Sequence, residues 1–72
     1  MEQFLEQIAE LLEEDVVNTS DELKSFDAWD SLTILSIIAF ADENYGVTLN
    51  AKEINEAQTV GGLKALIDSK VN

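Results

Sequence analysis

Apolar residues recur at the spacing of an α-helix near the beginning of the chain. Between residues 2 and 13, one stripe of apolar side chains faces away from a row of glutamates. This amphipathic pattern predicts a helix over residues 2–13. The apolar stripe consists of Phe4, Leu5, Ile8, Leu11 and Leu12.

A second, longer helix is predicted over residues 31–44. Asp30 is a suitable N-cap for this helix, and Gly46 can adopt the left-handed conformation that ends one. The expected core stripe comprises Ile34, Ile37, Ile38, Ala41 and Tyr45, and a second apolar row beside it comprises Leu32, Leu35 and Ala39.

Two shorter helices are predicted in the last third of the chain. Asn50 can cap a helix over residues 51–56 that points Ile54 inward, and Thr59 can cap a helix over residues 60–69. The expected buried side of the last helix carries Val60, Leu63, Leu66 and Ile67.

Two adjacent glycines stand in the first turn of the predicted helix 60–69. A glycine inside a helix costs about 1 kcal/mol relative to alanine. Gly61 and Gly62 therefore either permit close packing against a neighbouring segment or fray the first turn. The sequence leaves both interpretations open.

Residues 14–30 interrupt the helical period with turn-forming and cap-forming residues. We expect a long ordered loop here, with one turn of helix at residues 20–24. Scattered apolar side chains should hold the loop on the core, namely Val16, Val17, Leu23, Phe26 and Trp29. A loop of this length in a small domain is uncommon unless it is functional.

The whole pattern predicts an all-α fold in a single domain, residues 1–72. Val47 and Leu49 alternate with polar residues, but three residues are too few for a sheet. Three longer helices, a short third helix and a long loop between the first two are expected. A chain of 72 residues is stabilised by only about 4–11 kcal/mol. We therefore expect any chemistry on the surface and not in an enclosed substrate cavity.

The charge narrows the choice of partners. Fifteen acidic residues and four lysines give a formal net charge of −11. Nucleic acid and anionic membrane surfaces repel such a chain, whereas basic protein surfaces attract it. No apolar run is long enough to span a bilayer, and no basic-then-apolar leader begins the sequence. The expectation is a cytoplasmic protein, and monomer is the default because no feature indicates an oligomer.

The residues that usually perform catalysis or bind metal are missing. The sequence has no histidine and no cysteine. It therefore has no Ser-His pair, no thiol nucleophile and no ordinary zinc site. We expect no catalytic residues, no metal site and no enzymatic activity of the chain's own. The acidic run Glu13-Glu14-Asp15 is interpreted as a solvated face.

Ser31 follows the N-cap Asp30 directly and would lie in the first turn of its helix. Unpaired backbone N–H groups and the positive end of the helix dipole favour a phosphate at this position. A serine at a helix start is nevertheless most often a simple cap. The tripeptide Asp30-Ser31-Leu32 alone therefore favours capping.

The wider pattern from Phe26 to Ile67 resembles the acyl carrier protein family. The family has Asp-Ser-Leu at the head of its second helix, here Asp30-Ser31-Leu32 preceded by Trp29. An aromatic-glycine pair follows about fourteen residues later, here Tyr45-Gly46, and then the alternating segment Val47-Thr48-Leu49. Thr59-Val60 opens the last helix. The amino-terminal helix and the acidic loop match the family more loosely.

This resemblance implies a four-helix bundle of acyl-carrier type that carries 4′-phosphopantetheine on Ser31. The arm would come from coenzyme A through a separate phosphopantetheinyl transferase with magnesium. Its thiol would hold acyl intermediates as thioesters and present them to acyl-loading and acyl-using enzymes with basic docking surfaces. The implied pathways are fatty acid, polyketide or related lipid biosynthesis. Ser31 would be an acceptor and not a catalytic nucleophile.

The resemblance also implies a docking face on the second helix. The matching positions are Asp30, Leu32, Leu35, Ala39, Asp42 and Glu43. Many fatty-acid carriers have acids just after the motif, where this chain has Thr33 and Ser36. A less charged docking face is therefore expected, and an aminoacyl or peptidyl carrier of a specialised pathway fits at least as well. An unmodified acidic interaction module is the alternative from another functional class.

Overall fold

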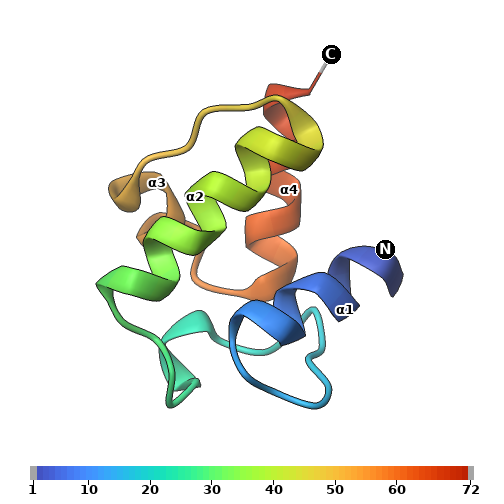
Figure 1. Ribbon diagram of the computed structural model, residues 1–72, viewed down its shortest axis with the longest axis vertical. Coiled ribbons are helices and arrows are strands. Elements are labelled where there is room, and N and C mark those ends of the chain that lie inside the picture. The colour runs from blue at the N-terminus through green and yellow to red at the C-terminus, as the bar shows by residue number, and fades with distance from the viewer. Residues whose placement is uncertain (1, 72) are drawn as a thin grey trace.

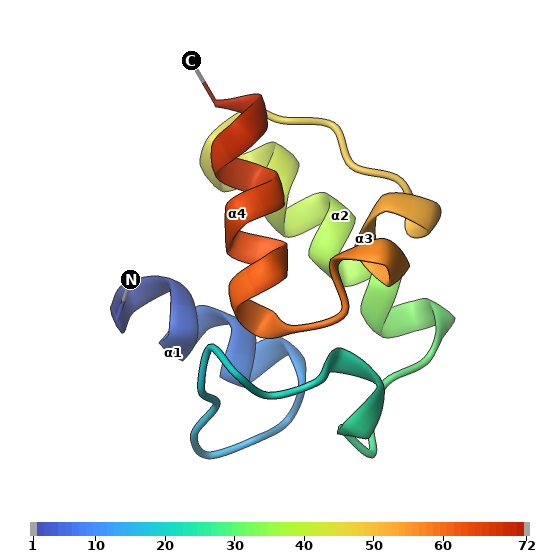
Figure 2. The ribbon, with the colours of Figure 1, turned by 180° about the vertical axis from the view of Figure 1, so that it is seen from behind.

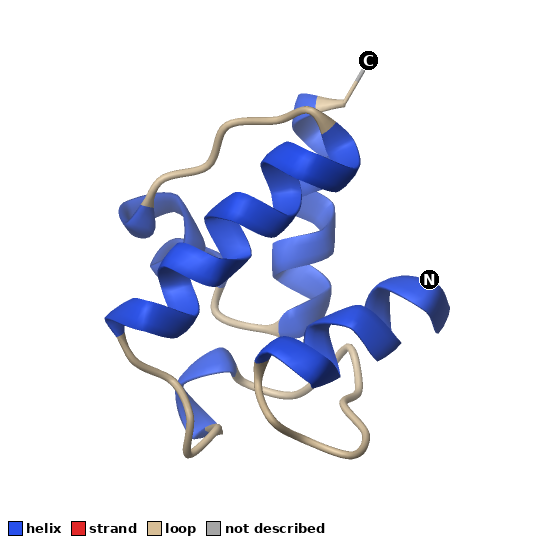
Figure 3. Cartoon of the chain, viewed as in Figure 1, coloured by secondary structure: helices blue, strands red, loops and turns tan. Residues whose placement is uncertain are grey.

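The computed structural model describes residues 2–71, which contain four α-helices and one short 3₁₀ helix (Figure 1). The elements are α1 (Glu2–Leu11), η1 (Leu23–Ser25), α2 (Ser31–Tyr45), α3 (Ala51–Ala57) and α4 (Val60–Lys70). Among the described residues there is no strand (Figure 3). The expected all-helical fold with a short third helix is therefore confirmed.

The four α-helices form a small bundle in which α2 packs against α1 and against α3, and α3 in turn packs against α4. In Figure 1, α2 runs diagonally across the front, with α4 behind it and α1 at its lower right. Figure 2 shows the reverse view, in which the loop from α1 to η1 passes beneath the lower end of α4.

Helix α1 ends at Leu11, two residues before the predicted boundary. The N–H of Glu13 bonds to the carbonyl of Glu10, and the N–H of Glu14 bonds to the carbonyl of Ala9. Glu13 has a φ of 59°. This is a Schellman ending, in which glycine is the usual residue at the left-handed position. The predicted helix 2–13 is too long because the glutamate at 13 gives no sequence signal for this turn.

Local caps begin the other three helices where the sequence predicts. The side chain of Asp30 accepts a hydrogen bond from the Thr33 N–H at the start of α2, and Thr59 does the same for Gly62 at the start of α4. Gly46, with a φ of 66°, ends α2 in the left-handed conformation. Helices α2, α3 and α4 each extend one residue beyond the predicted carboxyl boundary. The predicted turn of helix at 20–24 is η1, which starts later at Leu23.

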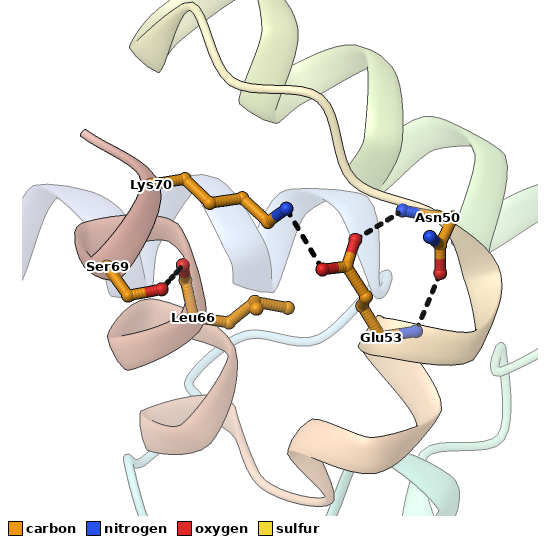
Figure 4. Close-up of polar contacts among 5 residues, drawn as sticks. All are labelled: Asn50, Glu53, Leu66, Ser69 and Lys70. Carbon is orange, nitrogen blue, oxygen red and sulfur yellow. Dashed lines mark hydrogen bonds and ion pairs between the residues drawn. The ribbon is translucent and has the colours of Figure 1, made fainter.

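Helix α3 is tied at its start to the end of α4. The side chain of Asn50 accepts from the Glu53 N–H at 2.8 Å, and the carboxylate of Glu53 accepts from the Asn50 N–H at 3.2 Å. The ammonium of Lys70 lies 2.9 Å from the same carboxylate (Figure 4). Nearby, the Ser69 hydroxyl donates to the Leu66 carbonyl. Glu53 is thus both the capping-box residue of α3 and one partner of the ion pair that joins α3 to α4.

The two glycines of α4 permit close packing, which resolves the question that the sequence left open. A β-carbon on Gly62 would overlap the carbonyl oxygen of Ala57, and one on Gly61 would lie 3.0 Å from the carbonyl oxygen of Thr19. The Ala57 carbonyl accepts the Thr59 N–H at 2.7 Å around Gln58, which has a φ of 68°. This γ-turn directs the carbonyl against the first turn of α4.

The core contains residues from every helix and from the long loop. Its buried apolar members are Phe4, Ile8, Ala9, Leu12, Val17, Leu23, Ile37, Phe40, Ala41, Val47, Leu49, Ile54, Val60, Leu63 and Ile67. The expectation that Val16 contacts the core is wrong, because its side chain is 73% exposed. Phe26 and Trp29 are half-buried and pack against the core as expected.

Candidate functional site at the start of α2

Ser31 is the first residue of α2, and it is exposed. Asp30 precedes it in an extended conformation with φ −150° and ψ −175°. The Asp30 carboxylate accepts the Thr33 N–H at 2.9 Å, and the Asp30 carbonyl accepts the Ile34 N–H at 3.0 Å. Two hydrogen bonds from the first turn therefore fix the direction of the chain at the residue before Ser31.

The first two backbone amides of α2 are not used by the Asp30 cap. Within residues 2–71, the N–H groups of Ser31 and Leu32 have no hydrogen-bond acceptor. These groups carry the positive partial charge of the helix end, where an anion is stabilised. The carboxylate of Asp30 opposes such an anion electrostatically, although it is itself held by the Thr33 amide. The site offers two free donors beside an accessible hydroxyl.

Thr33 is buried, with 8% of its surface exposed. Its hydroxyl donates a 2.6 Å hydrogen bond to the carbonyl of Ala28. The Trp29 N–H bonds to the Phe26 carbonyl at 3.1 Å, which gives the loop before the site a second internal contact. The expectation of a less charged docking face counted Thr33 beside Ser36, but the side chain of Thr33 is buried and holds the loop, so it is not part of an exposed face.

The predicted docking positions lie on one exposed face of α2. Leu32 is 72% exposed and Leu35 is 60% exposed, so two large apolar side chains one helical turn apart face solvent. The remaining predicted positions, Ala39, Asp42 and Glu43 along the helix and Asp30 at its start, are also exposed. Spacings of three, four and three residues from Leu32 to Asp42 keep these side chains on one side of a helix. Ser36 is exposed between them, and its hydroxyl donates to the Leu32 carbonyl.

The charged residues away from the start of α2 form no metal-binding group within the described part of the chain. Within residues 2–71, no three Asp or Glu side chains come together in a group that could hold a metal ion. The Lys70 ammonium, through its hydrogen bond and its charge, lowers the pKa of Glu53 from the usual value of 4.5. Both residues belong to the contact between α3 and α4 and not to the start of α2.

Two further findings bear on the site. None of the helices in the described part of the chain has the length and apolar character needed to cross a membrane. Comparisons with protein-family models, curated proteins and solved structures found no match to this chain.

Sequence reasoning missed the loop-holding role of Thr33 and the burial of Phe40. Thr33, Ile37, Phe40 and Ala41 are the buried residues of α2. Their spacing of four, three and one residues is itself helical. A signal was therefore present, but the isoleucines at 34 and 38 give an equally regular stripe, and both are only half-buried.

Proposed function

We propose that the protein is an acyl carrier protein that holds acyl groups as thioesters on 4′-phosphopantetheine esterified to Ser31. The observation that carries this proposal is the exposed hydroxyl of Ser31 at the first position of α2, next to two amides that have no acceptor among residues 2–71. A phosphodiester attached there would accept hydrogen bonds from those amides, and the positive end of the helix dipole would stabilise its negative charge.

The residues around Ser31 suit such an arm. The N–H groups of Ser31 and Leu32 can donate to phosphate oxygens, and the exposed side chains of Leu32 and Leu35 offer an apolar surface beside them. The arm supplies a thiol for thioester chemistry, and the sequence contains no cysteine that could supply one. Ser31 accepts the phosphoryl group as the pyrophosphate bond of coenzyme A breaks and adenosine 3′,5′-bisphosphate leaves. The hydroxyl proton goes to a base on the transferase, since the chain has no histidine.

Structural boundaries coincide with the landmarks of the family resemblance, which supports an acyl-carrier arrangement of the four helices. Asp30-Ser31-Leu32 stands at the start of α2, and Tyr45-Gly46 stands at its end. Thr59-Val60 stands at the start of α4. The long loop between α1 and α2 is also present, with η1 inside it.

The exposed face of α2 is the proposed docking surface for the transferase and for enzymes that load or use the acyl group. Its leucines would contact apolar positions of a partner, and its acids would face basic residues. Thr33 is buried, so only Ser36 makes this face less charged than that of many fatty-acid carriers. Fatty acid, polyketide or related lipid synthesis is therefore proposed first, and an aminoacyl or peptidyl carrier second.

The test is modification by a promiscuous phosphopantetheinyl transferase with coenzyme A and magnesium. Intact mass spectrometry should show the addition of one arm to the wild-type protein and to Ser36→Ala, which removes an exposed hydroxyl from the same helix. The variant Ser31→Ala should gain nothing. A wild-type chain that stays unmodified with several such transferases contradicts the proposal.

The exposure of Leu32 and Leu35 also favours a second candidate, an acidic interaction module that is never modified. Such a module would bind a basic partner equally well as wild type and as Ser31→Ala, and it would lose that binding in Leu35→Ser. Arm addition at Ser31 in the mass experiment would exclude it.

A further inference from the structure

An open groove of about 520 Å³ lies between α1 and the loop that follows it. Helix α1 contributes three side chains, and four consecutive loop residues contribute the rest. The lining residues are Leu5, Glu6, Ala9, Asp15, Val16, Val17 and Asn18. The groove includes neither Ser31 nor any predicted docking position on α2.

Two of the four apolar residues that line the groove, Leu5 and Val16, keep surface that a partner could cover. Val17 and Ala9 are buried, with exposed fractions of 3% and 5%, and Leu5 is half-buried. Val16 is 73% exposed, although its neighbour is in the core. A branched apolar side chain at the edge of an apolar groove gains free energy when a partner covers it, by about 25 cal/mol for each Å² removed from water.

Backbone hydrogen bonds fix both ends of the loop. At the α1 end, the N–H of Glu14 bonds to the Ala9 carbonyl at 2.9 Å. At the other end of the groove, the Asn18 N–H bonds to the Asp21 carboxylate at 2.9 Å. The Gly61 N–H then bonds to the Thr19 carbonyl at 2.8 Å, which attaches the loop to α4. The groove is therefore formed before any partner binds.

The charged residues that line the groove are both acidic. Eight of the fifteen acidic residues precede Lys24, the first basic residue of the chain. Glu6 and Asp15 line the groove, and Glu10, Glu13 and Glu14 are exposed nearby in the sequence. A second copy of this chain would be repelled here, as would an anionic lipid surface.

We propose that this groove binds a segment of a partner protein in which large apolar side chains alternate with lysine or arginine. The apolar side chains would cover Val16 and Leu5, while the cations would face Glu6 and Asp15. This surface is separate from the exposed face of α2 and needs no modification of Ser31. A partner could thus hold the protein at α1 while a second partner uses the start of α2.

The test uses the unmodified full chain and a synthetic peptide, acetylated and amidated, of sequence Lys-Leu-Lys-Leu-Lys. The matched peptide replaces both leucines by alanine and keeps the charge. Titrations are followed by backbone amide NMR shifts at about 0.15 M salt, where the Debye length is about 8 Å and diffuse attraction is screened. The leucine peptide should shift the amides of residues 5–18 and bind at least about threefold more tightly than the alanine peptide.

Two matched variants assign the site. Val16→Ser should weaken binding of the leucine peptide by about threefold to tenfold. Val71→Ser removes an exposed valine from the end of α4, outside both the groove and the exposed face of α2, and should leave the affinity unchanged. Both side chains are exposed, so both variants should fold. Shifts centred on α2, equal binding of the two peptides, or an unchanged affinity in Val16→Ser would each overturn the proposal. None of these results bears on whether Ser31 accepts the arm.

Discussion

The hydroxyl of Thr33 donates a 2.6 Å hydrogen bond to the carbonyl oxygen of Ala28, across the turn that presents Ser31. The backbone N–H of the same threonine is capped by Asp30. One buried residue therefore holds both the loop before Ser31 and the cap beside it. The position of the Ser31 hydroxyl therefore depends on the buried side chain of Thr33, which a docking partner would not contact.

Replacing this threonine by valine should reduce the free energy of unfolding. Thr33→Val keeps the shape of the side chain but removes the part-buried hydrogen bond to the carbonyl of Ala28, and a hydrogen bond of this kind contributes about 0.5–1.5 kcal/mol. Thr33→Ser retains the hydroxyl and should recover most of this loss. Urea denaturation measures both variants. A valine variant as stable as the wild-type protein would show that the hydrogen bond contributes nothing.

The end of α1 offers a stabilising substitution. Glu13 occupies a left-handed position with a φ of 59°, which costs a residue with a β-carbon about 1–2 kcal/mol. Glu13→Gly should therefore be more stable than Glu13→Ala by about 1 kcal/mol. The two variants lose the same charge, so their difference in thermal or urea unfolding reports the backbone conformation alone. A more stable alanine variant would contradict the Schellman ending.

The glycine pair predicts a reversal of ordinary helix propensity. Alanine is normally favoured over glycine by about 1 kcal/mol in a helix. Gly62→Ala should instead destabilise the protein by about 1–3 kcal/mol, because its β-carbon would overlap the Ala57 carbonyl. The exposed Ala65 in the same helix provides the control, since Ala65→Gly should follow propensity. Gain of stability in Gly62→Ala, measured by urea denaturation, would show that the α3–α4 turn is not as described.

The ion pair between Glu53 and Lys70 predicts a pH dependence. Lys70 lowers the pKa of Glu53 from 4.5, so the folded protein binds the Glu53 proton less readily than the unfolded chain does. The resulting stability is present above pH 4.5 and is lost as the pH falls through the lowered pKa. Lys70→Gln should raise the Glu53 pKa toward its usual value, as followed by carboxyl NMR titration.

Lys52→Gln is the matched control for that experiment. Lys52 is exposed on α3, and its replacement by glutamine removes the same charge as Lys70→Gln. Its loss should leave the Glu53 titration nearly unchanged. A Glu53 pKa that moves equally in both variants would indicate a general charge effect in place of the 2.9 Å pair.

The net charge of −11 predicts stabilisation by divalent cations. Repulsion among the carboxylates opposes the folded state, and bound or condensed cations reduce it. Millimolar magnesium should raise the midpoint of thermal unfolding more than sodium chloride of equal ionic strength. An unchanged midpoint by differential scanning calorimetry would contradict this expectation.

The starts of α2, α3 and α4 were predictable because their capping signals are local. Asp30, Asn50 and Thr59 each accept a hydrogen bond from an amide three residues later. The position of Ser31 at the head of α2 follows from the Asp30 cap, so the central residue of the candidate site was accessible from sequence. The end of α1 was not, because a glutamate takes the place where glycine would have marked the turn.

The buried face of α2 was not predictable in the same way. Between residues 34 and 41 nearly every side chain is apolar, so several faces satisfy helical periodicity. Packing against α1 and α3 decides that Phe40 is buried and that Ile34 and Ile38 are half-buried. Phe40 then lies in an aromatic cluster with Phe4 and Tyr45, at centroid distances of 6.1 and 5.8 Å.

By itself, the sequence determined where three of the four helices begin and that Ser31 heads α2, because caps depend on neighbours three or four residues apart. Tertiary structure alone decided that Thr33 holds the loop, that Val16 remains outside the core, and that Gly62 leaves room for a carbonyl. Each of these outcomes depends on which distant segments share a limited interior, and apolar character cannot specify that choice when there are more apolar side chains than buried positions.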